Sequence, residues 1–390
     1  MKPIPFAASL PMADLLQTSK LVEDVKYKFR KWEEAGQFQV HASQALYILR
    51  LTNPDGKLGY GLLGLLPAAS YGRGDILPHE ATLEEGRITQ IKALCDQQGM
   101  TKPVLLTYRQ SDILKGALER ALPMAKIVVD RTYLGYRYEY FALEGSEEIT
   151  ELQSIWSKCN PQLLVADGHH RLASSVILQE QPETGAPAYF SALLLADEWL
   201  TLDTFYRIIT PHPTQTAGEL LEELGAYFEL TDLGPLESEQ TSRPETDDEA
   251  RGSAKKTMTH GYWLLYLSGR VYQLRRKADA DQHSIDPIWF NDCILPRLFD
   301  IHDSRTDKRI SSKAMGPRGK SLTDWARKYP DHAIFAGHPI SGDDFFTLIE
   351  ERKLLPPKST CFYPRIPSGL VVYDWTKSPT SSKSAYTHQS

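Results

Sequence analysis

The sequence predicts a mixed α+β (mixed α/β) fold whose sheet is irregular rather than doubly wound. Short apolar runs typical of strands alternate with longer amphipathic segments typical of helices. Several of the predicted strands form hairpins, and the chain shows no regular βαβ rhythm. It also contains neither a G-x-G-x-x-G nor a Walker sequence. At 390 residues and 41% hydrophobic, the chain is long enough for a core domain with a second, smaller α+β domain.

The first half supplies the elements of the core domain. Apolar residues at helical spacing predict a helix over Leu21–Phe38. The runs Ala45–Leu51 and Leu58–Leu66 predict a hairpin, because the turn sequence Asn53-Pro54-Asp55-Gly56 separates them. Further along, the pattern predicts strands over 103–108, 133–143 and 188–195, and helices over 111–122 and 146–158.

A short polar segment precedes the next predicted helix. Thr82 and Glu85 form a capping box, so their simplest role is to begin that helix. His79 and Glu80 come just before the cap and are not needed for it. The cap therefore leaves their side chains available to point into a cleft.

The stretch Asp167-Gly168-His169-His170-Arg171 carries the strongest functional signal. The apolar run from Leu163 predicts a buried strand, and Leu172–Glu180 predicts a helix, so these five residues form the turn between them. Backbone N–H groups and the helix dipole favour an anion at such a turn, and Arg171 can grip a phosphate with two parallel hydrogen bonds. An Asp-Gly pair alone is ordinary turn chemistry, but two histidines and an arginine after it favour a phosphate or nucleotide site.

These residues resemble the signature of the family called domain of unknown function 1015. Further segments match in the same order: Pro78–Thr82, Arg207 after Phe205-Tyr206, Asp303–Arg309, Leu355–Thr360 and Ser368–Val372. The resemblance extends from about Lys20 to Tyr373. It implies a ParB/sulfiredoxin-like nucleotide-binding core related to the free L-serine kinases, in which the matching turn holds nucleotide phosphates.

The resemblance also implies which residues form the site. Asp167 and Glu80 are the candidate catalytic residues, and Asp167 is the candidate Mg²⁺ ligand. The candidate nucleotide- and phosphate-binding residues lie in both halves of the chain: Gly168, His169, His170, Arg171, His79, Arg207, Arg305, Lys308, Arg309, Lys358, Ser359 and Thr360.

Three departures from the family pattern concern catalysis more than fold. Ser9–Leu15 is a degenerate counterpart of the usual Ser-Pro-Pro-Tyr-Asp-Val segment. No position securely matches the N-terminal glutamate that serves as catalytic base in the serine kinases. After Arg309, only Arg318 and Gly319 are kept of the expected glycine-rich region. A descendant that binds nucleotide without turnover is therefore an alternative.

The composition suggests the boundaries within the chain. We expect a ParB/sulfiredoxin-like domain over 1–210, a connecting helix over 211–232, an acidic flexible loop over 233–258 and a C-terminal α+β domain over 259–374. A disordered tail follows over 375–390. Within the C-terminal domain, Tyr262–Leu267 and Val271–Leu274 predict a hairpin, Pro287–Phe299 predicts a helix, and Asp303–Arg309 predicts a charged loop.

Charge and cysteine content restrict the partners and the compartment. A net charge of −6 lacks the basic field that nucleic-acid binding uses, so nucleic acid is disfavoured as a partner. The four cysteines form no C-x-x-C pair and indicate neither a zinc site nor a disulfide frame. No apolar run is long enough to span a membrane, and no secretory segment is evident, so we expect a cytoplasmic protein.

Three functions fit these observations. The first is a small-molecule kinase that uses ATP or ADP with Mg²⁺ and phosphorylates a hydroxyl amino acid such as L-serine. The second is a non-catalytic nucleotide-binding regulator of the ParB-like type. The third is a metal-dependent hydrolase with His79, Glu80, His169 and His170 as ligands, although no H-E-x-x-H spacing supports it.

Overall fold

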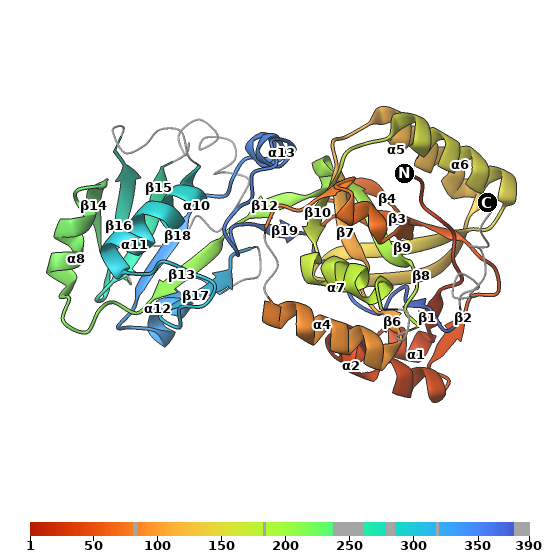
Figure 1. The fold of residues 1–390 in the computed structure, drawn as a ribbon, viewed down its shortest axis with the longest axis horizontal. Helices are drawn as coiled ribbons and strands as arrows, with labels where there is room; N and C mark the ends of the chain where they lie inside the picture. Colours follow the sequence, from red (N-terminus) through yellow and green to blue (C-terminus); the bar gives the residue numbers. More distant parts are fainter. Residues whose placement is uncertain (81–83, 182–184, 237–260, 278–284, 317–319, 378–390) are drawn as a thin grey trace. The chain divides into compact units, whose positions relative to one another are not determined.

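The computed structural model describes the chain except for residues 81–83, 182–184, 237–260, 278–284, 317–319 and 378–390. The chain divides into two units. Unit 1 consists of residues 1–200 together with the returning segment that begins at Pro364, and unit 2 is Thr201–Tyr363. Both units are mixed α/β, as the sequence predicts (Figure 1).

Unit 1 is built on an eight-stranded sheet with the order β5-β10-β7-β11-β4-β3-β9-β8. β5 pairs with β10 and β7 with β11 in parallel, and the other neighbours are antiparallel. β7 and β11 are buried along almost their whole length and are mostly apolar, because both faces of the sheet are covered. The strands are β3 (Leu46–Thr52), β4 (Leu58–Pro67), β5 (Ile76–Leu77), β7 (Val104–Tyr108), β8 (Lys126–Tyr133), β9 (Tyr136–Leu143), β10 (Leu163–Asp167) and β11 (Tyr189–Ala196).

Helices cover both faces of this sheet. Figure 1 shows α5 and α6 on one face and α2, α4 and α7 on the other. The stripe Leu21, Val25 and Phe29 of α2 is buried, which is the predicted core face of that helix. No helix of the described residues has the length and apolar character that crossing a membrane requires. The helices are α1 (Ala13–Leu16), α2 (Ser19–Glu34), α3 (Ala69–Gly72), α4 (Glu84–Gln97), α5 (Asp112–Ala121), α6 (Ser146–Cys159) and α7 (His169–Gln179).

Two predictions for unit 1 need comment. The single strand predicted over 133–143 is wrong at its start, because the chain forms a hairpin of β8 and β9 there. Leu134 and Gly135 both have positive φ, 52° and 84°, and make the turn between the strands. Thr82 lies outside the described residues, so its capping box stays a prediction, and α4 is described from Glu84.

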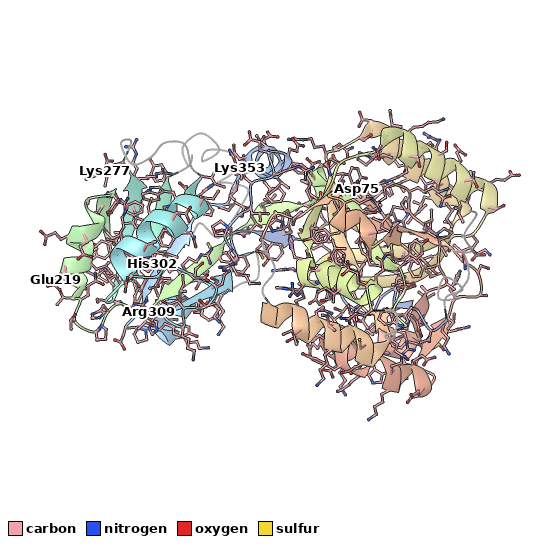
Figure 2. All side chains as sticks on the ribbon, viewed as in Figure 1. Asp75, Glu219, Lys277, His302, Arg309 and Lys353 are labelled. Carbon is pink, nitrogen blue, oxygen red and sulfur yellow. The ribbon has the colours of Figure 1, made fainter. Side chains whose placement is uncertain are left out.

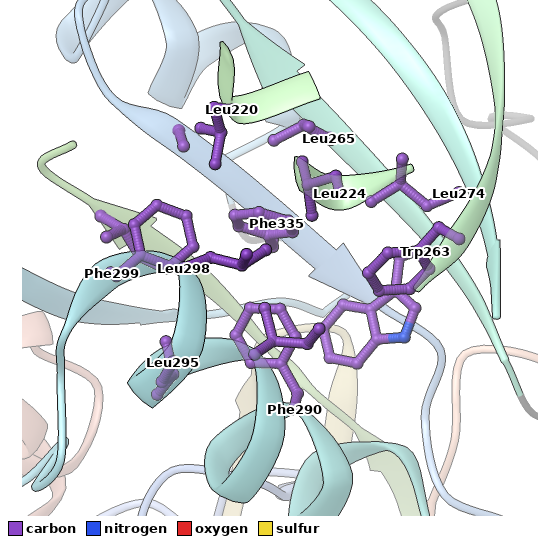
Figure 3. Packing of buried hydrophobic residues seen from close by; sticks show 14 of the residues in the cluster. Leu220, Leu224, Trp263, Leu265, Leu274, Phe290, Leu295, Leu298, Phe299 and Phe335 are labelled. Carbon is purple, nitrogen blue, oxygen red and sulfur yellow. The ribbon is translucent and has the colours of Figure 1, made fainter. Parts of the chain in front are cut away.

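Unit 2 has a six-stranded sheet with the order β14-β16-β15-β18-β13-β17. Its strands alternate between two cores: Phe335 packs with α8, α10 and α11, whereas Ile334 packs with α12. Figure 3 shows the first core, where Trp263 stacks on Phe290 with ring centroids 4.6 Å apart. The sheet consists of β13 (Phe205–Ile209), β14 (Phe228–Pro235), β15 (Tyr262–Leu267), β16 (Arg270–Arg276), β17 (Ile310–Ala314) and β18 (Ala333–Gly337).

The helices of unit 2 follow the sequence pattern with one correction. α8 (Ala217–Leu224) begins at the capping box of Thr216 and Glu219, but the helix predicted over 211–232 is too long. From Phe228 the chain is strand β14, which pairs with β16. Most of the acidic segment predicted over 233–258 lies outside the described residues. The remaining helices are α10 (Asp286–Trp289), a π-helical turn (Phe290–Ile294), α11 (Leu295–Phe299), α12 (Leu322–Lys328) and α13 (Gly342–Glu350).

The unit boundaries differ from the predicted domain boundaries of 210 and 374. β13 lies before residue 210, yet it pairs with β17 and β18 of unit 2. The strands by which the chain enters and leaves unit 2, β12 (Thr201–Asp203) and β19 (Cys361–Tyr363), pair with each other in antiparallel.

The chain then returns to unit 1 as a short C-terminal strand. β20 (Tyr373–Asp374) pairs with β6 (Gly99–Met100), while β1 (Ser9–Pro11) pairs with β2 (Phe38–Val40) in a separate small sheet. Arg30 holds the buried Asp374 with two hydrogen bonds of 2.6 and 2.7 Å. The last described residues are therefore an integral part of unit 1.

Candidate functional site

The candidate site of unit 1 is the corner where β10 meets α7. β10 ends at Asp167 and α7 begins at His169, so Gly168 alone connects them and the five-residue turn predicted over 167–171 is too long. Gly168 makes this reversal with φ of +107°, a conformation that residues with a Cβ rarely adopt. A Cβ on Gly168 would also lie 2.6 Å from Nη2 of Arg171. The glycine therefore allows the arginine to fold back over the corner.

Three cations surround the single carboxylate of this corner. Oδ2 of Asp167 lies 2.7 Å from Nη2 of Arg171 and 2.9 Å from Nζ of Lys102. Oδ1 lies 3.9 Å from Nη1 of Arg365. Arg171 also donates from Nη1 to the backbone oxygen of Lys102 at 3.2 Å, which fixes the plane of the guanidinium. These four side chains together carry two more positive charges than negative ones.

The electrostatics of the corner follow from this imbalance. Burial alone raises the pKa of Asp167, but the attraction of Lys102, Arg171 and Arg365 outweighs burial and holds the pKa well below its usual range. Burial lowers the pKa of Lys102, and the Asp167 carboxylate opposes that shift. The four side chains remain between 12% and 35% exposed, so the corner reaches the surface and is not sealed.

Two of these cations were not among the residues that the sequence singles out. Lys102 comes just before β7, which runs antiparallel to β10, so the start of β7 lies opposite the end of β10. Arg365 lies at the start of the segment that returns from unit 2, and its backbone oxygen accepts a hydrogen bond from the Tyr138 hydroxyl at 2.8 Å. If the antiparallel pairing of β7 with β10 had been predicted, it would have placed Lys102 near Asp167. The position of Arg365 could be seen only in the structure.

A second group in unit 1 contains His79, Glu80 and His169. The His79 backbone N–H donates to Nε2 of His169 at 3.3 Å, and the two rings meet edge to face with centroids 4.3 Å apart. Nδ1 of His169 lies 3.9 Å from a carboxylate oxygen of Glu80. Nδ1 of His79 lies 2.6 Å from the backbone oxygen of Val165, and burial lowers the pKa of His79.

His170 takes a different direction from its neighbour. Its ring packs on Gly86 of α4, where a Cβ would lie 2.7 Å from Cε1 of the imidazole. The structure therefore brings together three of the four residues considered as metal ligands. The ring of the fourth, His170 of α7, packs against α4 instead. Gly86 is needed at this point because the imidazole occupies the volume of any larger side chain.

Two of the predicted segments of unit 2, Arg207 and the turn Lys358–Thr360, lie close together. Arg207 of β13 donates to Oγ of Ser312 at 2.7 Å and to the backbone oxygen of Pro357 at 3.1 Å. The turn that follows holds Lys358, with φ of 60° and an exposed side chain, and the buried Ser359 and Thr360. Oγ of Ser359 donates to the backbone oxygen of Pro356 at 2.6 Å, so this hydroxyl shapes its own turn.

The loop at 303–309 pairs its arginines locally. Arg305 makes two hydrogen bonds of 2.8 and 2.9 Å to Asp303. Arg309 bonds Asp307 at 2.6 Å and also donates to the backbone oxygen of Asp300. Figure 2 labels Arg309 and His302 in this part of unit 2. Lys308 is exposed. Each arginine of this loop thus has a carboxylate two residues before it.

These observations define a class: a mixed α/β protein with a cation-lined corner where a strand meets a helix. The model of the family described as "Protein of unknown function (DUF1015)" matches residues 9–293, and the chain belongs to that family. The match includes the corner and ends before the 303–309 loop. No match is found among the curated proteins.

Several solved structures resemble the chain. SbnI with a C-terminal truncation, from Staphylococcus aureus, has 11% identity and a TM-score of 0.43, with 80% of this chain and 88% of that chain covered. Free serine kinase in complex with AMP has 14% identity and a TM-score of 0.40, covering 80% and 92%. A conserved hypothetical protein from Pyrococcus furiosus has 14% identity and a TM-score of 0.39, covering 80% and 96%.

Proposed function

We propose that the protein binds the phosphates of ATP or ADP at the β10–α7 corner and transfers a phosphoryl group to a small hydroxyl compound such as L-serine. The observation that carries the proposal is the cluster of Lys102, Arg171 and Arg365 around one carboxylate at a helix N-terminus. The choice of a purine nucleotide, the hydroxyl amino acid as acceptor, and the ParB/sulfiredoxin-type core follow the family resemblance.

The corner has the chemistry that a phosphate requires. Two of the five N–H donors of Arg171 make the contacts with Asp167 and Lys102, and the fork can donate others to phosphate oxygens. The first turn of α7 adds backbone N–H groups and the positive end of the helix dipole. Phosphoryl transfer depends mainly on positioning the reactants and on neutralising the charge of the phosphates. The surplus cations of the corner would neutralise that charge.

Glu80 is the better of the two candidate bases. The pKa of Asp167 is held low by its cations, and a weakly basic carboxylate accepts a proton poorly. Asp167 is better suited to holding Lys102 and Arg171 in place. Glu80 is partly exposed, and one of its carboxylate oxygens lies 3.9 Å from Nδ1 of His169. We therefore assign the acceptor hydroxyl to the side of the corner on which Glu80 lies.

The surroundings of Asp167 do not fit a Mg²⁺ ion bound directly to it. Mg²⁺ prefers oxygen ligands, and an ion on Asp167 would face the ammonium of Lys102 and the guanidinium of Arg171, both within 3 Å of the same oxygen. We assign no step to Mg²⁺ at Asp167. The cations of the chain itself neutralise the phosphates in this proposal.

The residues of unit 2 are a secondary part of the proposal. The family resemblance assigns Arg207, the 303–309 cations Arg305, Lys308 and Arg309, and the turn Lys358–Thr360 to the nucleotide. Their local hydrogen bonds give no support beyond that resemblance.

A binding protein without turnover is the second candidate. The segment Ser9–Leu15, which departs most from the family pattern, is used for structure: Ser9 is buried, exchanges backbone hydrogen bonds of 2.9 and 3.0 Å with Val372, and begins strand β1. This segment therefore supports the fold of unit 1, and its one carboxylate, Asp14 in the first turn of α1, is exposed.

The test incubates the pure protein with ATP or ADP and a panel of hydroxyl amino acids, with and without Mg²⁺. We expect nucleotide to raise the midpoint of thermal unfolding and a phosphorylated amino acid to form. Glu80→Gln should keep the thermal shift and lose the product, whereas Asp167→Asn should keep or tighten nucleotide binding. Stabilisation without product from any acceptor supports the binding protein. No stabilisation of the folded wild type by either nucleotide contradicts both.

A further inference from the structure

His79, Glu80 and His169 come from two distant parts of unit 1 and meet beside the corner. His79 and Glu80 follow β5, and His169 is the first residue of α7. One potential ligand atom from each lies within 4.8 Å of the other two, and the two imidazoles are buried. We propose that these three residues bind a divalent transition-metal ion such as Zn²⁺ or Mn²⁺.

The ligand atoms of this group lie slightly farther apart than they would around a bound ion, so a small movement toward one another would form the site. Bonds of 2.0–2.2 Å to nitrogen and oxygen in a tetrahedral arrangement put the ligand atoms about 3.4 Å apart. Nδ1 of His169 and the oxygen of Glu80 are 3.9 Å apart, which is too long for a hydrogen bond and needs only a small shift to accept an ion between them. The 3.3 Å contact of Nε2 is also long. Either nitrogen of His169 therefore exchanges a weak contact for a metal bond.

The surroundings orient His79 as a metal ligand. A ligating histidine almost always donates its other ring N–H to a carbonyl or carboxylate, which fixes the tautomer. Nδ1 of His79 lies 2.6 Å from the backbone oxygen of Val165 in β10, and a carbonyl can only accept, so Nδ1 is the donor and Nε2 carries the lone pair. β10 is hydrogen-bonded on both sides, to β5 and to β7, so this orientation is held by a rigid element.

The ligand set indicates the kind of ion and its use. Two imidazoles and one carboxylate suit Zn²⁺, Mn²⁺ or Fe²⁺ better than Mg²⁺, which prefers oxygen. Three protein ligands leave a position open for water or for a substrate oxygen, as in catalytic zinc sites. The use of this ion rests on the proposed function. Glu80 would then act on the acceptor hydroxyl indirectly, by holding an ion to which the hydroxyl binds, because a bound ion lowers the pKa of that hydroxyl.

The experiment measures metal binding alone. The full-length protein is treated with EDTA, dialysed and titrated with Zn²⁺ and Mg²⁺ by calorimetry, and with Co²⁺ by visible absorption. We expect one Zn²⁺ per chain, no comparable binding of Mg²⁺, and a Co²⁺ spectrum typical of four or five ligands. Glu80→Gln and His169→Ala should each lower the Zn²⁺ affinity at least tenfold. His41→Ala is the matched control, because it removes an imidazole that lies 3.0 Å from another carboxylate, Glu144, elsewhere in unit 1.

X-ray absorption on the zinc-loaded wild type provides evidence that needs no variant. Two imidazole nitrogens in the first coordination shell support the site, and a shell without imidazole overturns it, even if the histidine variants fail to fold. A folded wild type that binds no Zn²⁺, or Zn²⁺ binding that His169→Ala and His41→Ala leave equally strong, also overturns it. Nucleotide stabilisation measured in EDTA reports on the proposed function separately, so either result can fail alone.

Discussion

The β10–α7 corner of unit 1 and the 303–309 loop of unit 2 hold the same kinds of side chain in different balance. In the corner, Arg171, Lys102 and Arg365 share one carboxylate. In the loop, Arg305 and Arg309 each have an aspartate of their own two residues earlier. An arginine paired with its own carboxylate is already neutralised. An anion site therefore depends on cations in excess of the nearby carboxylates, and not on the number of arginines.

The largest effect is expected for Arg171→Ala. Charge-assisted hydrogen bonds contribute about 1.5–3 kcal/mol each, so the loss of this fork should weaken ADP binding by about 10- to 100-fold. Calorimetry measures the change. Arg171→Lys is the control and should recover only part of the affinity, because an ammonium keeps the charge without the two parallel donors. Unchanged affinity in Arg171→Ala would mean that the corner is not the phosphate site.

Lys102→Ala should have the next largest effect, about a tenfold loss of ADP affinity. Its Nζ lies 2.9 Å from Asp167, so its removal takes one cation from the corner and leaves Arg171 and the more distant Arg365 beside that carboxylate. Lys102→Arg keeps the charge and should stay within a few-fold of the wild type. If the two variants bind ADP equally weakly, the role of Lys102 is one of shape and not of charge.

Arg365→Ala should weaken ADP binding by about threefold. Its guanidinium is 35% exposed and 3.9 Å from Asp167, and exposed ion pairs contribute at most about 1 kcal/mol. Titrations at low and high salt should show that this contribution fades with screening. Arg137→Ala removes another exposed arginine of unit 1, one paired with Asp130, and should leave the affinity unchanged.

The smallest effect is expected for Arg305→Ala, less than about a twofold change in ADP affinity, because Asp303 already offsets this cation. The same titration measures it beside Arg171→Ala. A loss as large as that of Arg171→Ala would break the comparison. It would show that the 303–309 loop binds the nucleotide, as the family resemblance implies.

The sequence predicted what is local in the chain and missed what is distant. Gly168 and Arg171 could be recognised because a strand, a glycine and a helix follow one another directly. The exact junction between β10 and α7 could not be predicted, since only the φ of Gly168 reveals that a single residue makes the reversal. The strands of the hairpin at Leu134 were merged because the turn has no strong turn sequence other than one glycine.

The cations from elsewhere in the chain show the limit more clearly. Lys102 and Arg365 reach Asp167 through strand pairing and through the return of the chain from unit 2, and neither leaves a periodic signal in the sequence. His79 and Glu80 could be singled out because the helix cap did not need them. That His169 meets them while His170 turns to α4 follows from packing alone.

The pairing of Thr201 with Tyr363 makes unit 2 an insertion into unit 1. The two ends of the insert are paired on adjacent strands, about 5 Å apart, so a few residues could join the host if the insert were cut out. During synthesis, Arg365 is added only after the whole insert has been made. A chain that ends within unit 2 therefore lacks one of the three cations of the corner.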